Sequence, residues 1–201
     1  MSPTIHPTKA RLIETAAALL ETQFPGSVQV GEILEKSGIS KGSLYHHFED
    51  LGELLEAAQV ARYAEWVNRS IGLITPVLTE TKTRDEMIEG LRRITRFTQS
   101  AEFKGMRFQR ARALANAETS KRFEHALGVE QERLNIALAD LVQEAKNKGL
   151  FKEELDPRIV AIFIQSYTLG KIVDDIVPDP MAQEMWENFI VNMLVATMVT
   201  Q

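Results

Sequence analysis

The sequence predicts an all-α protein of about nine helices. Apolar residues recur at the three-and-four spacing of helices that are buried on one face. No run of period-two alternation indicates a strand, and neither Asn-Gly nor Asp-Gly, the common hairpin turns, occurs. Glycine and proline divide the apolar stretches into segments of helical length, so short turns are expected between the helices.

The composition is that of an ordinary globular protein, and it excludes several kinds of site. The chain has 201 residues, 44% of them hydrophobic, which is enough to bury a core without disulfides. Without cysteine there is no disulfide and no thiolate metal site, and the four histidines are scattered along the sequence. We therefore expect no metal and no cofactor.

No targeting signal is visible in the sequence. Met1 to Pro7 lack the basic and apolar runs of a signal or transit peptide. The most apolar stretch, Phe189 to Val199, has about half of the ~20 residues that a membrane span needs, and it contains Asn192. We expect a cytoplasmic protein without a membrane anchor.

The first three helices are expected before residue 50. Thr8 is expected to cap helix one, and Pro25-Gly26 to end it. Its buried face is formed by apolar residues at helical spacing: Ile13, Ala16, Ala17, Leu20 and Phe24. Helix two spans about Val30 to Ser37 and ends at Gly38, which suits the positive φ found after a helix terminus. Helix three follows, from Lys41 to about His47, with Ser40 as its cap.

The next four helices have recognisable ends. Asp50 is expected to cap a long helix four, which Thr75-Pro76 ends at about residue 74. Thr83 and Glu86 form a capping box for helix five, and helix six follows through Phe108 and Leu114. Helix seven is long, with Thr119 as its expected cap and Gly149 at its end.

The last two helices are predicted to form a dimer interface. Asp156-Pro157 and Asp179-Pro180 each pair an N-cap with a proline at the first helical position. The helices that they open are apolar on more than one side, so they must be covered nearly all round. A second copy, packing as a four-helix bundle, is the simplest cover. The alternative is a central core helix within the monomer.

These helices are grouped into two domains. Residues 1–50, which hold the first three helices, are expected to form one domain, and residues 51–201 a second one. Helix four, at about 50–74, connects them.

The segment from Val30 to Phe48 has the packing pattern of a helix-turn-helix. Val30, Ile33 and Leu34 supply the inner face of helix two, and Leu44 and Phe48 pack helix three back against it. The outer face of helix three then carries donors, rings and one small residue, namely Lys41, Gly42, Ser43, Tyr45, His46 and His47. Such groups suit phosphates and base edges. The alternative for the last three is a polar helix surface without a partner.

The run GISKGSLYHHF, preceded by EILEK and followed by ELL, resembles the TetR family of transcriptional regulators over about Thr8 to Ala58. The resemblance implies an all-α dimer, usually a repressor. In such proteins a variable C-terminal domain binds a small molecule and changes the spacing of the two recognition helices.

The resemblance also assigns roles to residues. Lys41, Gly42 and Ser43 correspond to base-facing positions, and Tyr45 and His47 to phosphate-contacting ones. His46 could do either. At the start of helix two, Gln29 and Val30 match positions that approach the backbone or an outer base.

One position departs from the family pattern. Leu51 stands where the family commonly has a lysine that reaches a phosphate, and acidic residues outnumber basic ones over the first fifty residues. We expect relatively weak nonspecific DNA binding, or a contribution from Lys9, Arg11 or the N-terminus.

A pocket for the ligand is expected among helices four to eight, lined by aromatic and apolar side chains. The candidates are Trp66, Met87, Phe97, Phe103, Phe108, Phe123 and Tyr167, with Arg107 or Arg110 as an anion clamp. Ordinary core packing is the alternative for each aromatic residue. The run Arg107, Arg110 and Arg112 has the alternative of a solvated or intersubunit face.

The sequence therefore predicts a homodimeric repressor that a small-molecule effector releases from a palindromic DNA operator. The alternative is that the protein activates transcription instead of repressing it. A small α-helical enzyme is a rival, but no HExxH, GxSxG, phosphate-loop or EF-hand motif occurs. An interaction protein that does not bind DNA is a third reading, which Leu51 favours.

Overall fold

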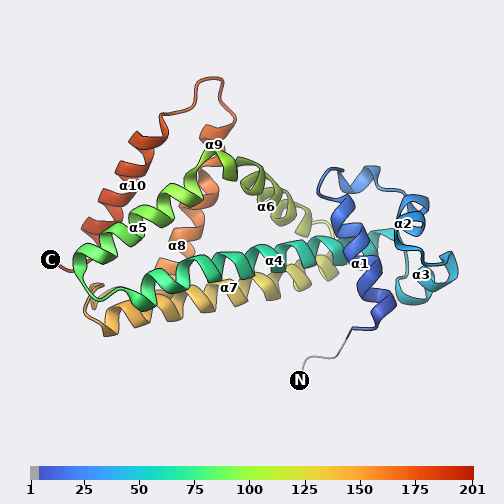
Figure 1. The fold of residues 1–201 in the computed structure, drawn as a ribbon, viewed down its shortest axis with the longest axis horizontal. Coiled ribbons are helices and arrows are strands. Elements are labelled where there is room, and N and C mark those ends of the chain that lie inside the picture. The colour runs from blue at the N-terminus through green and yellow to red at the C-terminus, as the bar shows by residue number, and fades with distance from the viewer. Residues whose placement is uncertain (1–4) are drawn as a thin grey trace. The chain divides into compact units, whose positions relative to one another are not determined.

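The computed structural model describes residues 5–201, and Figure 1 shows an all-helical chain. Within that range the only β-type pairing is an isolated bridge between Phe151 and Val199. The α-helices are α1 (Pro7–Leu19), α2 (Val30–Ser37), α3 (Lys41–His47), α4 (Leu51–Glu80), α5 (Arg84–Gln99), α6 (Lys104–Ala117), α7 (Lys121–Asn147), α8 (Pro157–Gly170), α9 (Ile172–Asp175) and α10 (Gln183–Met198). Because α9 is a single turn of 4 residues, the prediction of an all-α fold with about nine helices is confirmed.

The chain divides into two compact units. The first contains the residues up to Trp66 together with Ala117–Leu127, and the second contains Val67–Asn116 together with Gly128–Gln201. The helices α4 and α7 each contribute residues to both units. The domain boundary expected at residue 50 stays a prediction.

The first unit has its own apolar core. Its fully buried members come from α1, the α2–α3 segment and the first turns of α4, and they include Leu12, Ala16, Ile33, Leu44 and Leu54. The first helix begins at Pro7 instead of after Thr8, because the Nδ1 atom of His6 accepts the Thr8 amide and caps it. The expectation of Thr8 as cap is therefore wrong.

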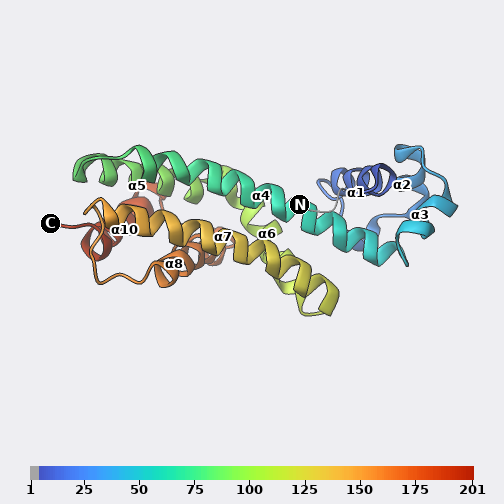
Figure 2. The same cartoon turned by 90° about the horizontal axis from the view of Figure 1, so that it is seen from below.

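The second unit is built on α4, α5, α7, α8 and α10. Within this unit α4 and α7 lie side by side (Figures 1 and 2), and Arg133 Nη1 donates to Asn68 Oδ1 at 2.8 Å. Its core combines Leu78 of α4, Met87 of α5, Val142 of α7 and Ile190 of α10, all buried. Elements that are far apart in the sequence thus share one core.

Helix caps confirm several predicted starts. The hydroxyl of Thr83 accepts the Glu86 amide while the Glu86 carboxylate accepts the Thr83 amide, which is the expected capping box. At α8, Asp156 accepts the amides of Arg158 and Ile159, with Pro157 at the first helical position.

Two other starts are displaced from their expected positions. Ser120, not Thr119, caps α7, since its Oγ accepts the Phe123 amide at 3.3 Å. The last helix begins at Gln183 instead of directly after Asp179-Pro180, and no side chain caps it.

Pro76 does not end α4, contrary to the expectation of a break at Thr75-Pro76. The helix continues to Glu80 although an internal proline costs about 3 kcal/mol. The turn that follows is held by packing, because Val77 and Leu78 are buried. The Thr75 hydroxyl also donates to the Ile71 carbonyl at 2.8 Å within the same turns.

None of the helices in the described part of the chain is long and apolar enough to cross a membrane.

Candidate nucleic-acid interface

The turn between α2 and α3 has the geometry that its sequence predicts. Gly38 adopts φ 68°, and its amide donates to the Leu34 carbonyl at 3.0 Å. Ser37 is buried and accepts the Ile39 amide at 3.2 Å. The hydroxyl of Ser40 accepts the Ser43 amide at 3.2 Å and begins α3. The hydrogen bonds of this turn are all local, because each joins residues at most four positions apart.

Packing holds one face of α3 against the core of the first unit. Leu44 is fully buried, and Phe48, which directly follows α3, is nearly so. Both join the core cluster that contains Ile33 of α2 and Leu12 of α1. The remaining face of α3 is therefore directed to solvent.

The outward face carries the residues that the sequence singled out. Lys41, Gly42 and His46 are exposed, and the Tyr45 side chain is 46% exposed. The Lys41 ammonium lies 6.0 Å from the centroid of the Tyr45 ring, at the outer limit of a cation–π contact. A Cβ atom added at Gly42 would meet nothing within 4 Å, so this part of the surface is open.

At the start of α2, Gln29 is exposed and Val30 is half-buried. Gln29 is the N-cap residue but makes no side-chain cap, so the first amides of α2 have no acceptor from it. Val30 packs against the core cluster of the first unit. Free amides at a helix start favour an anion such as a phosphate.

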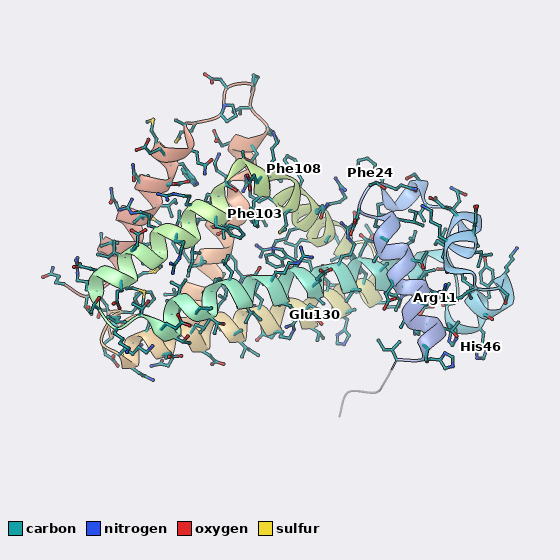
Figure 3. The ribbon with its side chains drawn as sticks, viewed as in Figure 1. Arg11, Phe24, His46, Phe103, Phe108 and Glu130 are labelled. Atoms are coloured by element: carbon teal, nitrogen blue, oxygen red, sulfur yellow. The ribbon has the colours of Figure 1, made fainter. Side chains whose placement is uncertain are left out.

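Three of the four histidines cluster beside α3, which the scattered spacing did not predict. The ring centroids of His6 and His47 lie 4.9 Å apart, and those of His46 and His47 lie 5.1 Å apart. The Lys9 ammonium is 5.0 Å from the Phe48 ring centroid. Figure 3 shows His46 near the N-terminal end of α1. Desolvation lowers the pKa of His47, and the nearby His6, His46 and Lys9 lower it further.

The start of α4 uses its acidic residues for capping. Asp50 accepts the Glu53 amide at 2.8 Å, and the Glu53 carboxylate accepts the Glu49 amide at 2.7 Å. Leu51 is half-buried and packs against the core of the first unit. No lysine stands at this position.

The candidate ligand residues do not all belong to one unit. Trp66 and Phe123 fall in the first unit, where Phe123 is buried and Trp66 lies 5.2 Å from Tyr63 between ring centroids. The other candidates fall in the second unit, namely Met87, Phe97, Phe103, Arg107, Phe108 and Tyr167.

Those in the second unit differ in exposure. Met87 is fully buried in the core, while Phe97 is exposed and its ring centroid lies 4.3 Å from that of Phe103. Figure 3 marks Phe103 and Phe108 near the junction of α5 and α6. Burial raises the pKa of Tyr167, an effect that the nearby hydroxyls of Thr95 and Thr168 partly offset.

Arg107 is engaged in a buried ion pair. Its Nε donates to Asp175 Oδ2 at 2.6 Å and its Nη2 to Asp175 Oδ1 at 2.8 Å, while Nη1 donates to the carbonyls of Thr98 and Ser100. Arg110 is also buried and donates to Gln165 Oε1 at 3.0 Å. The alternative of a solvated face is therefore wrong for these two arginines.

Sequence reasoning missed two polar groups in the second unit. Thr95 and Gln99 are one helical turn apart on α5 and are buried, and Thr95 Oγ1 and Gln99 Nε2 have no hydrogen-bond partner of normal geometry among the described residues. The Oε1 atom of Gln99 accepts the indole N–H of Trp186 at 2.8 Å. Their helical spacing looked like ordinary polar surface, so no sequence signal marked them.

Within residues 5–201, no group of three or more His, Asp or Glu side chains is arranged to hold a metal ion. The three-histidine cluster is thus not a metal centre by its geometry.

Two helices joined by a tight glycine turn, with the second helix exposing a polar face, form a helix-turn-helix, the arrangement that many DNA-binding regulators use. Residues 12–58 match the family model for bacterial regulatory proteins of the tetR family. Over these residues, which include α2 and α3, the chain is similar to the N-terminal domain of TetR-family transcriptional regulators.

One curated relative and two solved structures are similar to the chain over most of its length. The chain is 25% identical over 166 residues to the HTH-type transcriptional repressor KstR2 of Mycolicibacterium smegmatis. The aligned region covers 78% of this chain and 74% of that protein. A TetR-family regulator from Mesorhizobium loti has a similar structure, with a TM-score of 0.71, 18% identity, and coverage of 96% of this chain and 97% of that one. The reduced form of Escherichia coli NemR gives a TM-score of 0.68 at 16% identity, over 98% and 99% of the two chains.

Proposed function

We propose that the chain is a repressor that acts as a homodimer on a palindromic operator and is released by a small-molecule effector. The observation that carries this proposal is the solvent-exposed face of α3, held in place by the buried Leu44. An α-helix fits the major groove, where the edges of all four base pairs are distinguishable. The relative from Mycolicibacterium smegmatis is named a repressor, which supports this sign of regulation over activation.

The proposed DNA contacts follow from position and exposure. Lys41, Gly42 and Ser43 are assigned to base edges, Tyr45 and His47 to phosphates, and His46 to either. The exposed Gln29 and the uncapped start of α2 are assigned, with Val30, to the backbone or an outer base. Phosphate contacts set position on the duplex, while base contacts supply sequence preference.

Exposed apolar side chains support dimerisation through α8 and α10. Large apolar residues on these helices that face solvent in the single chain are Ile159, Ile162, Phe163, Met185 and Phe189. Several large exposed apolar side chains on the same two helices favour an interface that buries them. Covering it with the same helices of a second copy gives the closed, two-fold arrangement that a palindromic operator requires.

The effector is assigned to the second unit. The unpaired Gln99 Nε2 and Thr95 Oγ1 need an oxygen acceptor and a hydrogen-bonding partner, and Tyr167 lies close to Thr95. Arg107 is already neutralised by Asp175, so a neutral ligand with a carbonyl or hydroxyl oxygen suits this region better than an anion. The aromatic pair Phe97 and Phe103 supplies apolar surface in the same unit.

In the proposed mechanism the dimer has two states that differ in the separation of the α3 helices. The DNA-binding state places them in successive major grooves, about 34 Å apart. An effector that binds the other state more tightly lowers operator affinity by its differential binding energy. A protein that binds an operator must share a compartment with that DNA, so the proposal includes a cytoplasmic location.

A mobility-shift assay with the chain's own upstream DNA at moderate salt tests DNA reading. The parent chain should bind this DNA in preference to a scrambled duplex, and Lys41→Ala should reduce that preference. Lys36→Ala is the matched control, since Lys36 lies on α2 and pairs with Glu32 at 3.1 Å. Equal binding to both duplexes would contradict the proposal, and a reporter gene under the same promoter distinguishes repression from activation.

A further inference from the structure

We propose that His6 and Lys9, at the start of α1, join His46 and His47 in one phosphate-binding surface whose charge is supplied by protonation. DNA affinity is then coupled to pH. This inference rests on the proposed DNA-binding function of α3, and it adds a second element, α1, to the contact surface.

The geometry brings two distant segments together. His6 and His47 are far apart in the sequence, yet their ring centroids lie 4.9 Å apart. His6 is exposed, and in its neutral form Nδ1 accepts the Thr8 amide at 3.2 Å while the Nε2 edge is left for a ligand. Protonation of this ring gives up the Thr8 hydrogen bond, and an anion bound at Nε2 has to offset that loss. Lys9 lies over the Phe48 ring on the neighbouring turn of α1, and His46 is exposed on the other side of His47.

The surroundings of the cluster explain why protons matter here. The groups that act electrostatically on His47 are His6 from the segment before α1, Lys9 from α1, and His46 from α3, and all of them are basic. Desolvation, and after it the nearby His6, His46 and Lys9, lower the pKa of His47, so the free protein disfavours the charged form of this imidazole. The acidic Asp50 and Glu53 that follow α3 are hydrogen-bonded to backbone amides as caps.

A DNA phosphate bound at this surface favours protonation of the imidazoles. An anion close to the imidazoles favours their charged form and raises their pKa, so the complex binds more protons than the free protein. Affinity therefore rises as pH falls through the interval between the lowered pKa of the free state and the raised pKa of the complex. In a chain with a net charge of -5 and Leu51 in place of a phosphate-reaching lysine, these protons supply positive charge that the sequence lacks.

The experiment measures operator affinity of the full chain by fluorescence anisotropy at pH 8.0 and pH 6.0, over a range of salt concentrations. We expect binding about tenfold tighter at pH 6.0, because the complex takes up protons that the free protein does not hold. The slope of log affinity against log salt should also steepen by about 0.9 for each phosphate contact added.

Two variants make the test specific. His6→Asn retains a good N-cap for α1 but removes the imidazole, and it should lose most of the gain at pH 6.0. His125→Gln is the matched control, because His125 is the remaining histidine and is exposed on α7 away from the cluster residues in sequence. It should keep the full gain.

The outcomes separate this inference from the proposed function. Sequence-specific binding with no gain at pH 6.0, or the full gain in His6→Asn, overturns the cluster while leaving the α3 assignment intact. Absence of sequence-specific binding at both pH values contradicts both. As a second readout, proton NMR should record a higher pKa for the His47 imidazole when the operator duplex is added, and an unchanged value would also overturn the inference.

Discussion

The polar side chains of the two units are arranged in opposite ways. On α3 of the first unit, Lys41, Tyr45 and His46 are directed to solvent, and the hydrogen bonds of the turn that begins the helix span only a few residues. In the second unit, Arg107 and Gln165 are buried and bond to groups far away in the sequence. The turn that presents the outward face of α3 is thus encoded by neighbouring residues. The buried polar groups of the second unit depend instead on contacts between segments that are far apart in the sequence.

The largest expected effect comes from the buried ion pair of the second unit. Arg107→Met should lower the free energy of unfolding by about 3 kcal/mol, because the buried Asp175 loses its two short hydrogen bonds and keeps only the Lys171 ammonium, at 3.9 Å. Urea denaturation followed by circular dichroism measures it. Arg107→Met combined with Asp175→Leu should recover most of the loss, and Lys121→Met, which breaks the exposed pair with Glu124, should leave the midpoint unchanged. A small loss in Arg107→Met would contradict the role given to this pair.

The next effect separates the two faces of α3. Leu44→Ala should cost about 3 kcal/mol of stability because it leaves a cavity in the core of the first unit. Tyr45→Ala, the adjacent residue, should scarcely change stability but should weaken operator binding. Thermal unfolding and anisotropy on both variants check this. If Tyr45→Ala proved as destabilising as Leu44→Ala, Tyr45 would be a packing residue.

A smaller effect is expected at the glycines of the helix-turn-helix. Gly38→Ala should cost about 1–2 kcal/mol, because φ 68° is strained for a residue with a Cβ atom. Gly42→Ala should instead stabilise α3 by up to about 1 kcal/mol, since the added methyl meets no atom of the chain. The same methyl should reduce operator affinity if a base edge approaches Gly42. Unchanged affinity in Gly42→Ala would count against that contact.

The smallest expected effect concerns the unpaired hydroxyl of α5. Thr95→Val should raise the free energy of unfolding by about 1 kcal/mol, because it removes a buried polar atom that has no partner of normal geometry. A stability gain of this kind is typical of positions kept for function. Destabilisation by Thr95→Val, measured by urea denaturation, would mean that the hydroxyl is already satisfied and would remove it from the effector proposal.

Local signals explain what the sequence could predict. Gly38, Ser40, Thr83 with Glu86, and Asp156-Pro157 act within a few residues, and each produced the expected turn or cap. The family motif lies in the same locally encoded region, so the candidate DNA surface could be predicted residue by residue.

The features that the sequence did not predict have a common physical cause. Pro76 remains inside α4 because Val77 and Leu78 are buried, a fact that local propensity does not contain. The approach of His6 to His47 and the pairing of Arg107 with Asp175 join segments separated by long stretches of chain. Spacing along a single helix could not indicate either of them, and both bear on the proposed mechanism.

The central claim is that the outward face of α3 reads DNA. Hydroxyl-radical footprinting of the parent chain and of Lys41→Ala on the upstream DNA tests it most directly. For the parent chain, the account predicts two protected half-sites whose centres are about 34 Å apart. For Lys41→Ala, it predicts that protection of the half-sites no longer differs from protection of the flanking sequence. A uniform or absent footprint for the parent chain, or an identical footprint for Lys41→Ala, would contradict it.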